Sequence, residues 1–316
     1  MKKITGLPII TCGDEEYIEE EPFVTDSSSK AFTFVQGLAA DLQQGEIELP
    51  AFPDVVKRLQ IILVDPNSSA KDVVEVIAVD PILTTRLMKM ANSAALNPKG
   101  IKIENLGSAI SRLGFNLVRS TATAYAMNQM QKQEELAPIR GQLLDIWKSS
   151  NNVAAICYVI SKNVLRRRPD EAVLAGLLHQ IGRLYILVHA HTTNPGLLND
   201  DEYLDVVETW QAGIGRHILE SWTLPEPICD AIATQDSLLD EDEKEDEPDA
   251  AEPTSLARLL SAATLRQRLS SDPRIRQLHP NVDDLMQTVE IDGVNFLDAI
   301  VANHDAIESM QQTLSA

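Results

Sequence analysis

The chain has only three cysteines and no long uninterrupted run of apolar residues. Cys12, Cys157 and Cys229 are odd in number and widely spaced without a CxxC pair, which suits reduced thiols and disfavours structural disulfides. No run of about eighteen apolar residues is present to cross a membrane, and residues 1–10 are too short and too broken by glycine and proline for a signal-peptide core. We therefore expect a soluble, cytoplasmic protein without a membrane partner.

Basic residues are also scarce. The 27 lysines and arginines face 47 aspartates and glutamates, which gives a formal charge of -20 at pH 7. Because phosphate contacts depend on clusters of Lys and Arg, this balance argues against nucleic acid as a direct partner. The densest basic run, Arg166–Arg168, precedes Pro169, and we interpret it as complementing the negative end of a helix dipole. No GKS or GKT occurs, so no phosphate-binding loop is predicted.

Short alternating strand patterns are almost absent. Apolar residues recur instead at steps of three and four, beginning with Phe34, Val35 and Leu38, and this periodicity predicts helices. The fold class expected is therefore all-α. Helices in the second half of the chain are expected at Leu143 to Leu165, Asp170 to Val188, Glu202 to Glu220 and Pro225 to Ala233.

Three polar residues are expected to fix helix ends without any chemistry. Ser69 and Asp80 are suited to cap helices, and Pro81 suits a first turn because its missing N–H is not needed there. The Asn92 amide is suited to tie adjacent helices at a chain reversal, since it can satisfy backbone groups.

Breaks in the pattern divide the chain into five parts. We expect an acidic N-terminal leader at 1–29, a helical lobe at 30–142, a second helical lobe at 143–235, an acidic linker at 236–252, and helices at 253–316 that pack on the second lobe. The linker is rich in Asp and Glu and lacks the glycine that an EF-hand loop places sixth. A solvated segment is therefore favoured over a calcium site.

Several short motifs occur in a fixed order along this framework. They are Leu49–Pro53, Val79–Leu83, Lys89–Ala94, Ala109–Gly114, Leu174–Leu184 and Gly215–Glu226. They look like the LPxxP, DPxL, NSA, AIxxLG, histidine-containing and GxxLLxxWxLPE signatures of the HDOD domain, the output-domain branch of the HD phosphohydrolase superfamily. The resemblance covers roughly residues 35–235. It implies a two-lobed helical HDOD fold whose second lobe is a helical bundle like that of HD domains.

A typical relative would hold metal in the second lobe with histidines and aspartates. The resemblance places those positions, in chain order, at Ser149, His179, Gln180, Gln211, Gln235, Asp236 and Ala263. Only His179 and Asp236 keep groups that commonly bind metal, and the Gln180 amide is a neutral dipole that cannot replace a bridging carboxylate. We therefore expect a vestigial pocket formed by Ser149, His179, Gln180, Gln211, Gln235 and Asp236, with no catalytic residue, metal or cofactor.

These substitutions favour a non-catalytic regulatory protein. The resemblance implies a role in bacterial signal transduction through protein partners such as a sensor or a cyclase. One alternative is a sensor that binds a nucleotide or another small molecule in the emptied pocket. A second is a metal-dependent phosphohydrolase with atypical ligands, which would have to recruit His179, His217 and Asp236. The only literal His-Asp dipeptide, His304–Asp305, lies far beyond the motifs, and we expect it not to bind metal.

Overall fold

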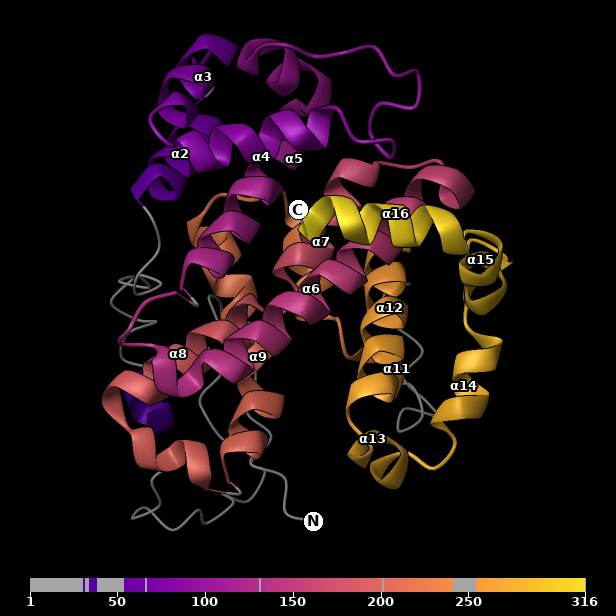
Figure 1. Cartoon of the computed structure of the whole chain (residues 1–316). Coiled ribbons are helices and arrows are strands. Elements are labelled where there is room, and N and C mark those ends of the chain that lie inside the picture. Colours follow the sequence, from indigo (N-terminus) through magenta and orange to yellow (C-terminus); the bar gives the residue numbers. More distant parts are fainter. Residues whose placement is uncertain are drawn as a thin grey trace, which may run out of the picture.

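The chain folds almost entirely into α-helices, which confirms the predicted fold class (Figure 1). In the computed structural model, the structure describes residues 31, 34–38, 54–65, 67–130, 132–200, 202–240 and 254–315. The expected leader at 1–29, the first motif at Leu49–Pro53 and residues 241–252 of the expected linker lie outside the described residues.

The elements follow one another as helices with short connections. Up to residue 165 they are α2 (Asp54–Val64), α3 (Ala70–Ala78), α4 (Pro81–Ala91), α5 (Leu106–Met130), a 3-10 turn (Ala137–Ile139), α6 (Arg140–Ile160) and a π-helical turn (Ser161–Leu165). Next come α7 (Pro169–Leu178), α8 (Ile181–Thr193), a 3-10 turn (Pro195–Asn199), α9 (Glu202–Ser221), α10 (Glu226–Ala233) and α11 (Ser237–Asp240). The last are α12 (Ser255–Ser271), α13 (Arg274–Leu278), α14 (Val282–Thr288), β1 (Glu290–Ile291), β2 (Val294–Asn295), α15 (Phe296–Ala302) and α16 (His304–Ser315).

The N-terminal helices α2 to α5 form one group, at the top of Figure 1. Their predicted caps are confirmed. Ser69 accepts from the Asp72 N–H in a capping box at the start of α3, and Asp80 accepts from the Ile82 and Leu83 N–H groups at the start of α4. Asn92 exchanges hydrogen bonds of 2.8 and 2.9 Å with the backbone of Ile103, so it ties the end of α4 to the chain that leads into α5.

The central helices pack through close contacts at glycine. A Cβ at Gly176 of α7 would come 2.5 Å from the Ala154 Cα of α6. A Cβ at Gly182 of α8 would overlap the Gln211 carbonyl oxygen and approach the Gly215 nitrogen of α9 to 2.8 Å. Only glycine fits at such crossings, so these positions hold α6 against α7 and α8 against α9.

The expectation of one helix from Asp170 to Val188 was wrong. The helix ends at Leu178 and a new one starts at Ile181, so His179 and Gln180 form the junction. Together the two helices occupy Pro169–Thr193, a stretch long and apolar enough to cross a membrane by length and composition alone. Nevertheless 83% of its most apolar window is buried inside the protein, as in core helices of a folded domain.

The C-terminal elements contact both groups of helices. Helix α12 packs on α10, α6 and α7, and α16 packs along α6. The Arg86 Nη2 of α4 donates 2.7 Å to the Leu314 oxygen of α16. A two-residue hairpin, β1 with β2, turns at Asp292 and Gly293, both with positive φ.

The expected linker begins with ordered structure. Residues 237–240 form α11, where Leu238 and Leu239 are buried, because this apolar pair packs against α12.

Candidate functional site

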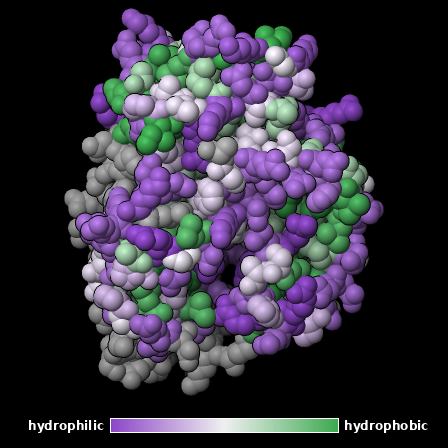
Figure 2. All heavy atoms as spheres, viewed as in Figure 1, coloured by the Kyte–Doolittle hydropathy of each residue, from purple (hydrophilic) through white to green (hydrophobic). Residues whose placement is uncertain are grey.

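A polar cavity of about 550 Å³ lies between α6, α8, α9 and α12. Five of the six residues expected to form a vestigial pocket line it, namely Ser149, His179, Gln180, Gln211 and Gln235. The sixth, Asp236, lies beside the cavity and contacts two lining residues. In Figure 2, the surface is hollowed in the lower middle, among mostly hydrophilic residues. The sequence pattern thus located residues that the fold brings together from four segments.

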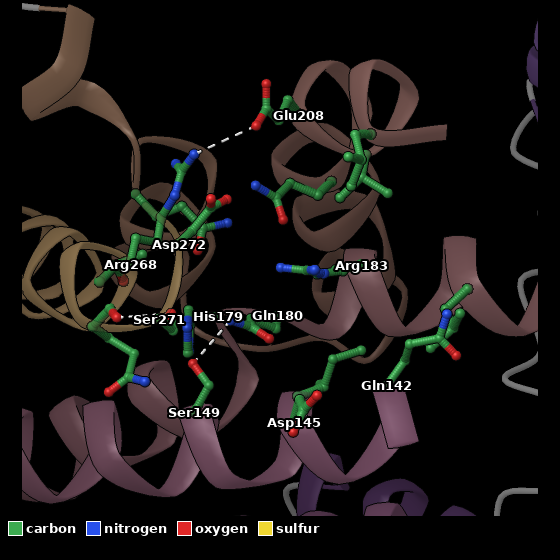
Figure 3. A pocket seen from close by; sticks show the side chains of 18 of the residues that line it. Gln142, Asp145, Ser149, His179, Gln180, Arg183, Glu208, Arg268, Ser271 and Asp272 are labelled. Atoms are coloured by element: carbon green, nitrogen blue, oxygen red, sulfur yellow. Dashed lines mark hydrogen bonds and ion pairs between the residues drawn. The ribbon is translucent and has the colours of Figure 1, made fainter. Parts of the chain in front are cut away.

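The break between α7 and α8 places two of these side chains in the cavity. His179 ends α7 and Gln180 precedes α8. The Gln180 Nε2 donates 3.0 Å to the Oγ of Ser149 on α6 (Figure 3). The amide and the hydroxyl, at two positions where the resemblance predicts metal ligands, therefore bond to each other.

The His179 ring bonds to the backbone of its own helix and not to the polar side chains of Ser149, Gln180 or Gln211. Its Nδ1 lies 2.7 Å from the Gly176 carbonyl oxygen, and because a carbonyl only accepts, Nδ1 carries the hydrogen. Burial lowers the pKa of His179 to about 4, against the opposing Gly176 hydrogen bond and with help from the nearby Arg183 charge. The imidazole is therefore neutral at pH 7. Its Nε2 is a bare acceptor, buried without a partner in the described part of the chain.

The polar groups on the α9 and α10 side are held by α12. The Gln211 Nε2 donates 3.4 Å to one Asp236 oxygen, while the Arg268 Nη1 donates 2.6 Å to the other. Gln235 is only 2% exposed, and its Nε2 has no partner among the described residues. Thr264 of α12 also lines the cavity with an unpartnered hydroxyl, whereas Ala263, the position suggested for a final aspartate, is buried in the core.

Arginines around the cavity were missed by the sequence reasoning. Arg268 pairs with Asp236, and Arg274 pairs with Asp272 at 2.6 Å. Arg183, half-buried on α8, points into the cavity in Figure 3. Within the part of the chain that the structure describes, it forms no hydrogen bond or ion pair. Its position could have revealed it, because Arg183 lies only four residues after His179 in the sequence.

The donor set does not fit a divalent metal ion. A stable site needs roughly four or more donors, mostly imidazole or carboxylate. Here a single imidazole lines the cavity. The carboxylates of Asp236, Asp272 and Glu208 pair with arginines, and a fourth carboxylate, Asp145, is exposed on α6. Among the described residues, no three His, Cys, Asp or Glu side chains are grouped to hold a metal. His304 and Asp305 are exposed at the start of α16, away from the cavity.

The chain is similar to known proteins in both sequence and structure. A family model described as HDOD domain matches residues 49–238, which contain every motif quoted above. The chain is similar to the crystal structure of a protein named "Putative metal-dependent phosphohydrolase" from Shewanella amazonensis SB2B, with a TM-score of 0.63, 26% identity, and coverage of 90% of this chain and 99% of that one.

Two further relatives are more distant. An HDOD domain protein with unknown function from Geobacter sulfurreducens has a TM-score of 0.53 and 21% identity, with 88% of this chain and 97% of that chain covered. An uncharacterized protein from Treponema pallidum (strain Nichols) is 23% identical over 218 residues, which are 62% of this chain and 39% of that protein. The chain therefore spans less than half the length of this curated relative.

Proposed function

Because the chain belongs to the HDOD domain family, we propose that it is a non-catalytic regulatory module of bacterial signal transduction. It works in the cytoplasm through protein partners, such as a sensor or a cyclase. The observation that carries the proposal is the set of groups at the former metal positions. Gln180 and Ser149 bond to each other, and Asp236 is neutralised by Arg268.

Electrostatics support this choice. Metal-assisted phosphate hydrolysis needs a cation that polarises a phosphoryl oxygen or activates water. The cavity instead presents a neutral imidazole, neutral amides and the cations of Arg183 and Arg268. Its carboxylates, apart from the exposed Asp145, pair with arginines, so we expect a dication to bind weakly. The Shewanella amazonensis protein carries a phosphohydrolase name, but the donors present in this chain do not support the same chemistry here.

The pocket has a structural role in this proposal. The Gln180–Ser149 bond joins the start of α8 to α6, and the Gln211–Asp236–Arg268 chain joins α9 to α12. These side chains thus hold together four helices where ions would do so in a metal enzyme. A regulatory domain needs such a fixed arrangement to present one surface to a partner.

The test measures metal content and turnover in the same protein. The purified chain is incubated with Mn²⁺, Fe²⁺ or Zn²⁺, freed of unbound ions and analysed for bound metal, then assayed against a panel of phosphodiesters. We expect far less than one ion per chain and no turnover above that of His179→Ala. Stoichiometric metal and turnover that both disappear in His179→Ala would establish the phosphohydrolase alternative.

Partner binding needs a separate measurement. Val79 and Ile82, at the turn between α3 and α4, are 65% and 60% exposed, and such apolar side chains are common at protein contacts. We expect the wild-type chain to capture a defined set of cytoplasmic proteins, and the Val79→Glu, Ile82→Glu variant to lose them while it stays folded. Identical capture by the two proteins would remove this turn from the interface.

A small-molecule sensor is a second candidate function. It is favoured by Arg183 and by the polar atoms of the cavity that find no partner among the described residues. Binding of a ligand here would change the contacts between α6, α8, α9 and α12, and so pass a chemical signal to a protein partner.

A further inference from the structure

We infer that the cavity binds a small molecule that carries an oxyanion group, held by Arg183, and a hydrogen-bond donor, received by the Nε2 of His179. This inference rests on the proposed function in one respect, namely that the pocket binds the molecule without cleaving it. It deepens that function by assigning the chemical class of the signal.

Arg183 supplies the anion-binding group. It is half-buried and close enough to His179 for its charge to oppose protonation of the imidazole. The other two arginines of the cavity already have carboxylate partners, Asp236 for Arg268 and Asp272 for Arg274. A guanidinium removed from water without a counter-ion raises the free energy of the folded state, and a planar oxyanion restores the lost interactions through paired hydrogen bonds.

Buried polar atoms of the cavity that find no partner among the described residues are available to form hydrogen bonds with the rest of the ligand. His179, Gln235 and Thr264 are 1%, 2% and 4% exposed, and each lines the cavity. Each also has one polar side-chain atom that finds no partner in the described residues. The tautomer of His179 makes its Nε2 an acceptor, while the Gln235 Nε2 is a donor. Buried polar groups are nearly always hydrogen-bonded, so these atoms indicate a bound polar molecule or ordered water.

The size and the charge of the cavity limit which ligands can bind. A volume of about 550 Å³ falls within the range of roughly 300–1,000 Å³ that is usual for small-molecule sites. Asp145 is a lining carboxylate that lies exposed on α6 and forms no ion pair with any residue that the structure describes. Because it can compete for Arg183, the ligand must offer a stronger anion than this one exposed side chain, such as a phosphate monoester or a polycarboxylate.

The experiment uses inorganic phosphate as the minimal probe of the Arg183 subsite. Thermal unfolding of the full chain is followed in increasing phosphate, against chloride at matched ionic strength, because a ligand of the folded state raises its stability by mass action. We expect a saturable rise in Tm for the wild-type chain and an apparent affinity weakened about tenfold or more in Arg183→Gln, since charge-assisted hydrogen bonds are lost.

Two variants serve as controls. Arg58→Gln makes the same change at an exposed residue of α2 and should leave the phosphate response unaltered. Asp145→Asn removes the competing carboxylate and should strengthen the response. The inference is overturned if phosphate gives no more stabilisation than chloride, or if Arg183→Gln and wild type respond alike, because the cavity would then hold only water.

Larger probes separate the possible sources of the oxyanion. Nucleoside 5′-monophosphates and citrate are titrated in the same assay, together with a matched Thr264→Val variant that removes a lining hydroxyl. If the monophosphates bind more tightly than phosphate alone, the ligand is a phosphate monoester. If citrate is preferred, the ligand is a polycarboxylate. Equal binding of all probes would contradict the role given to the buried polar atoms.

Turnover is measured on the same samples with an aryl phosphodiester and Mn²⁺. Phosphate binding without turnover supports both proposals. Binding with turnover keeps the ligand site and removes the non-catalytic function, whereas neither binding nor turnover removes the ligand site and leaves the function standing.

Discussion

The Nε2 of Gln180 donates a 3.0 Å hydrogen bond to the Oγ of Ser149. This bond crosses the cavity wall from the α7–α8 junction to α6, between two positions where the resemblance to HDOD domains predicts metal ligands. In the proposed non-catalytic pocket the two substitutions are coupled, because each side chain satisfies the other. A single reversion would therefore break an existing contact before it could build a site.

Gln180→Asp alone is predicted not to create a metal site. Among the described residues, His179 would be the only imidazole lining the cavity beside the new carboxylate, and the cation of Arg183 would compete with a metal ion for it. We expect less than a tenth of an ion per chain by metal analysis, on the order of adventitious binding. The combined variant Ser149→His, Gln180→Asp, Gln211→His should bind substantially more Mn²⁺ or Zn²⁺. Stoichiometric metal in the single variant would show that the missing charge at position 180 was the sole obstacle.

Gly182→Ala is predicted to destabilise the fold strongly. An added Cβ would overlap the Gln211 carbonyl oxygen and force α8 away from α9. Overpacking of this kind typically costs about 1–3 kcal/mol, and a backbone obstacle places this variant at or above the upper end. The free energy of unfolding is measured by urea denaturation.

A matched control lies on the neighbouring helix. Gly213 of α9 has open space where a Cβ would be built. Gly213→Ala should therefore be neutral or stabilise by about 0.5–1 kcal/mol through helix propensity. Similar unfolding free energies for the two alanine variants would contradict the proposed tight crossing of α8 and α9.

Much of this fold was predictable because its signals are local. Ser69, Asp80 and Asn92 act on backbone groups within a few residues or at the next turn of chain, so residue type alone indicated their roles. The pocket residues Ser149, His179, Gln180, Gln211 and Gln235 were located through their spacing relative to family motifs, and they do line one cavity.

Other features depend on contacts that no local pattern records. The break at His179 falls inside an apolar stretch whose periodicity continues through it, so one helix was expected where two exist. The partner of Asp236 is Arg268 of α12, 32 residues later in the chain, and this pairing becomes visible only after the helices pack. The Gly176 partner of His179 likewise depends on the geometry of the helix end.

Tyr125→Phe is predicted to destabilise the N-terminal helices modestly. The Tyr125 hydroxyl donates 2.8 Å to an Asp80 oxygen, while the other Asp80 oxygen caps α4. The substitution removes one hydrogen bond but keeps the cap, so we expect a loss of about 1 kcal/mol in unfolding free energy. Asp80→Ala removes the cap as well and should cost about 2 kcal/mol or more. Equal losses for the two variants would mean that the cap contributes nothing.

The Tyr125 phenol offers a spectroscopic check of the same contact. Burial, followed by the hydrogen bond and the charge of Asp80, raises the pKa of Tyr125 to about 12. In an absorbance titration, Tyr125 should therefore ionise well above the usual value of about 10, together with Tyr203, whose pKa burial also raises to about 12. Asp80→Asn removes the negative charge and should lower the pKa of Tyr125 toward its usual value, although burial keeps part of the increase. An unchanged titration in Asp80→Asn would exclude Asp80 as a cause.

His179 is predicted to make the protein less stable in mild acid. The folded state protonates its buried imidazole only near pH 4, whereas the unfolded chain does so near the ordinary value of 6.5. Between these values the unfolded chain binds more protons, so the unfolding free energy falls as the pH decreases from 6.5 toward 4. The full effect is on the order of 3 kcal/mol.

Urea denaturation at pH 7, 6 and 5 measures how steeply the unfolding free energy changes with pH. His179→Gln, which cannot titrate, should show a shallower slope than wild type, while His304→Gln, at an exposed position of α16, should keep the wild-type slope. If His179→Gln loses stability as steeply as wild type over this range, the imidazole is already accessible to protons in the folded state, and the cavity is wetter than its burial indicates.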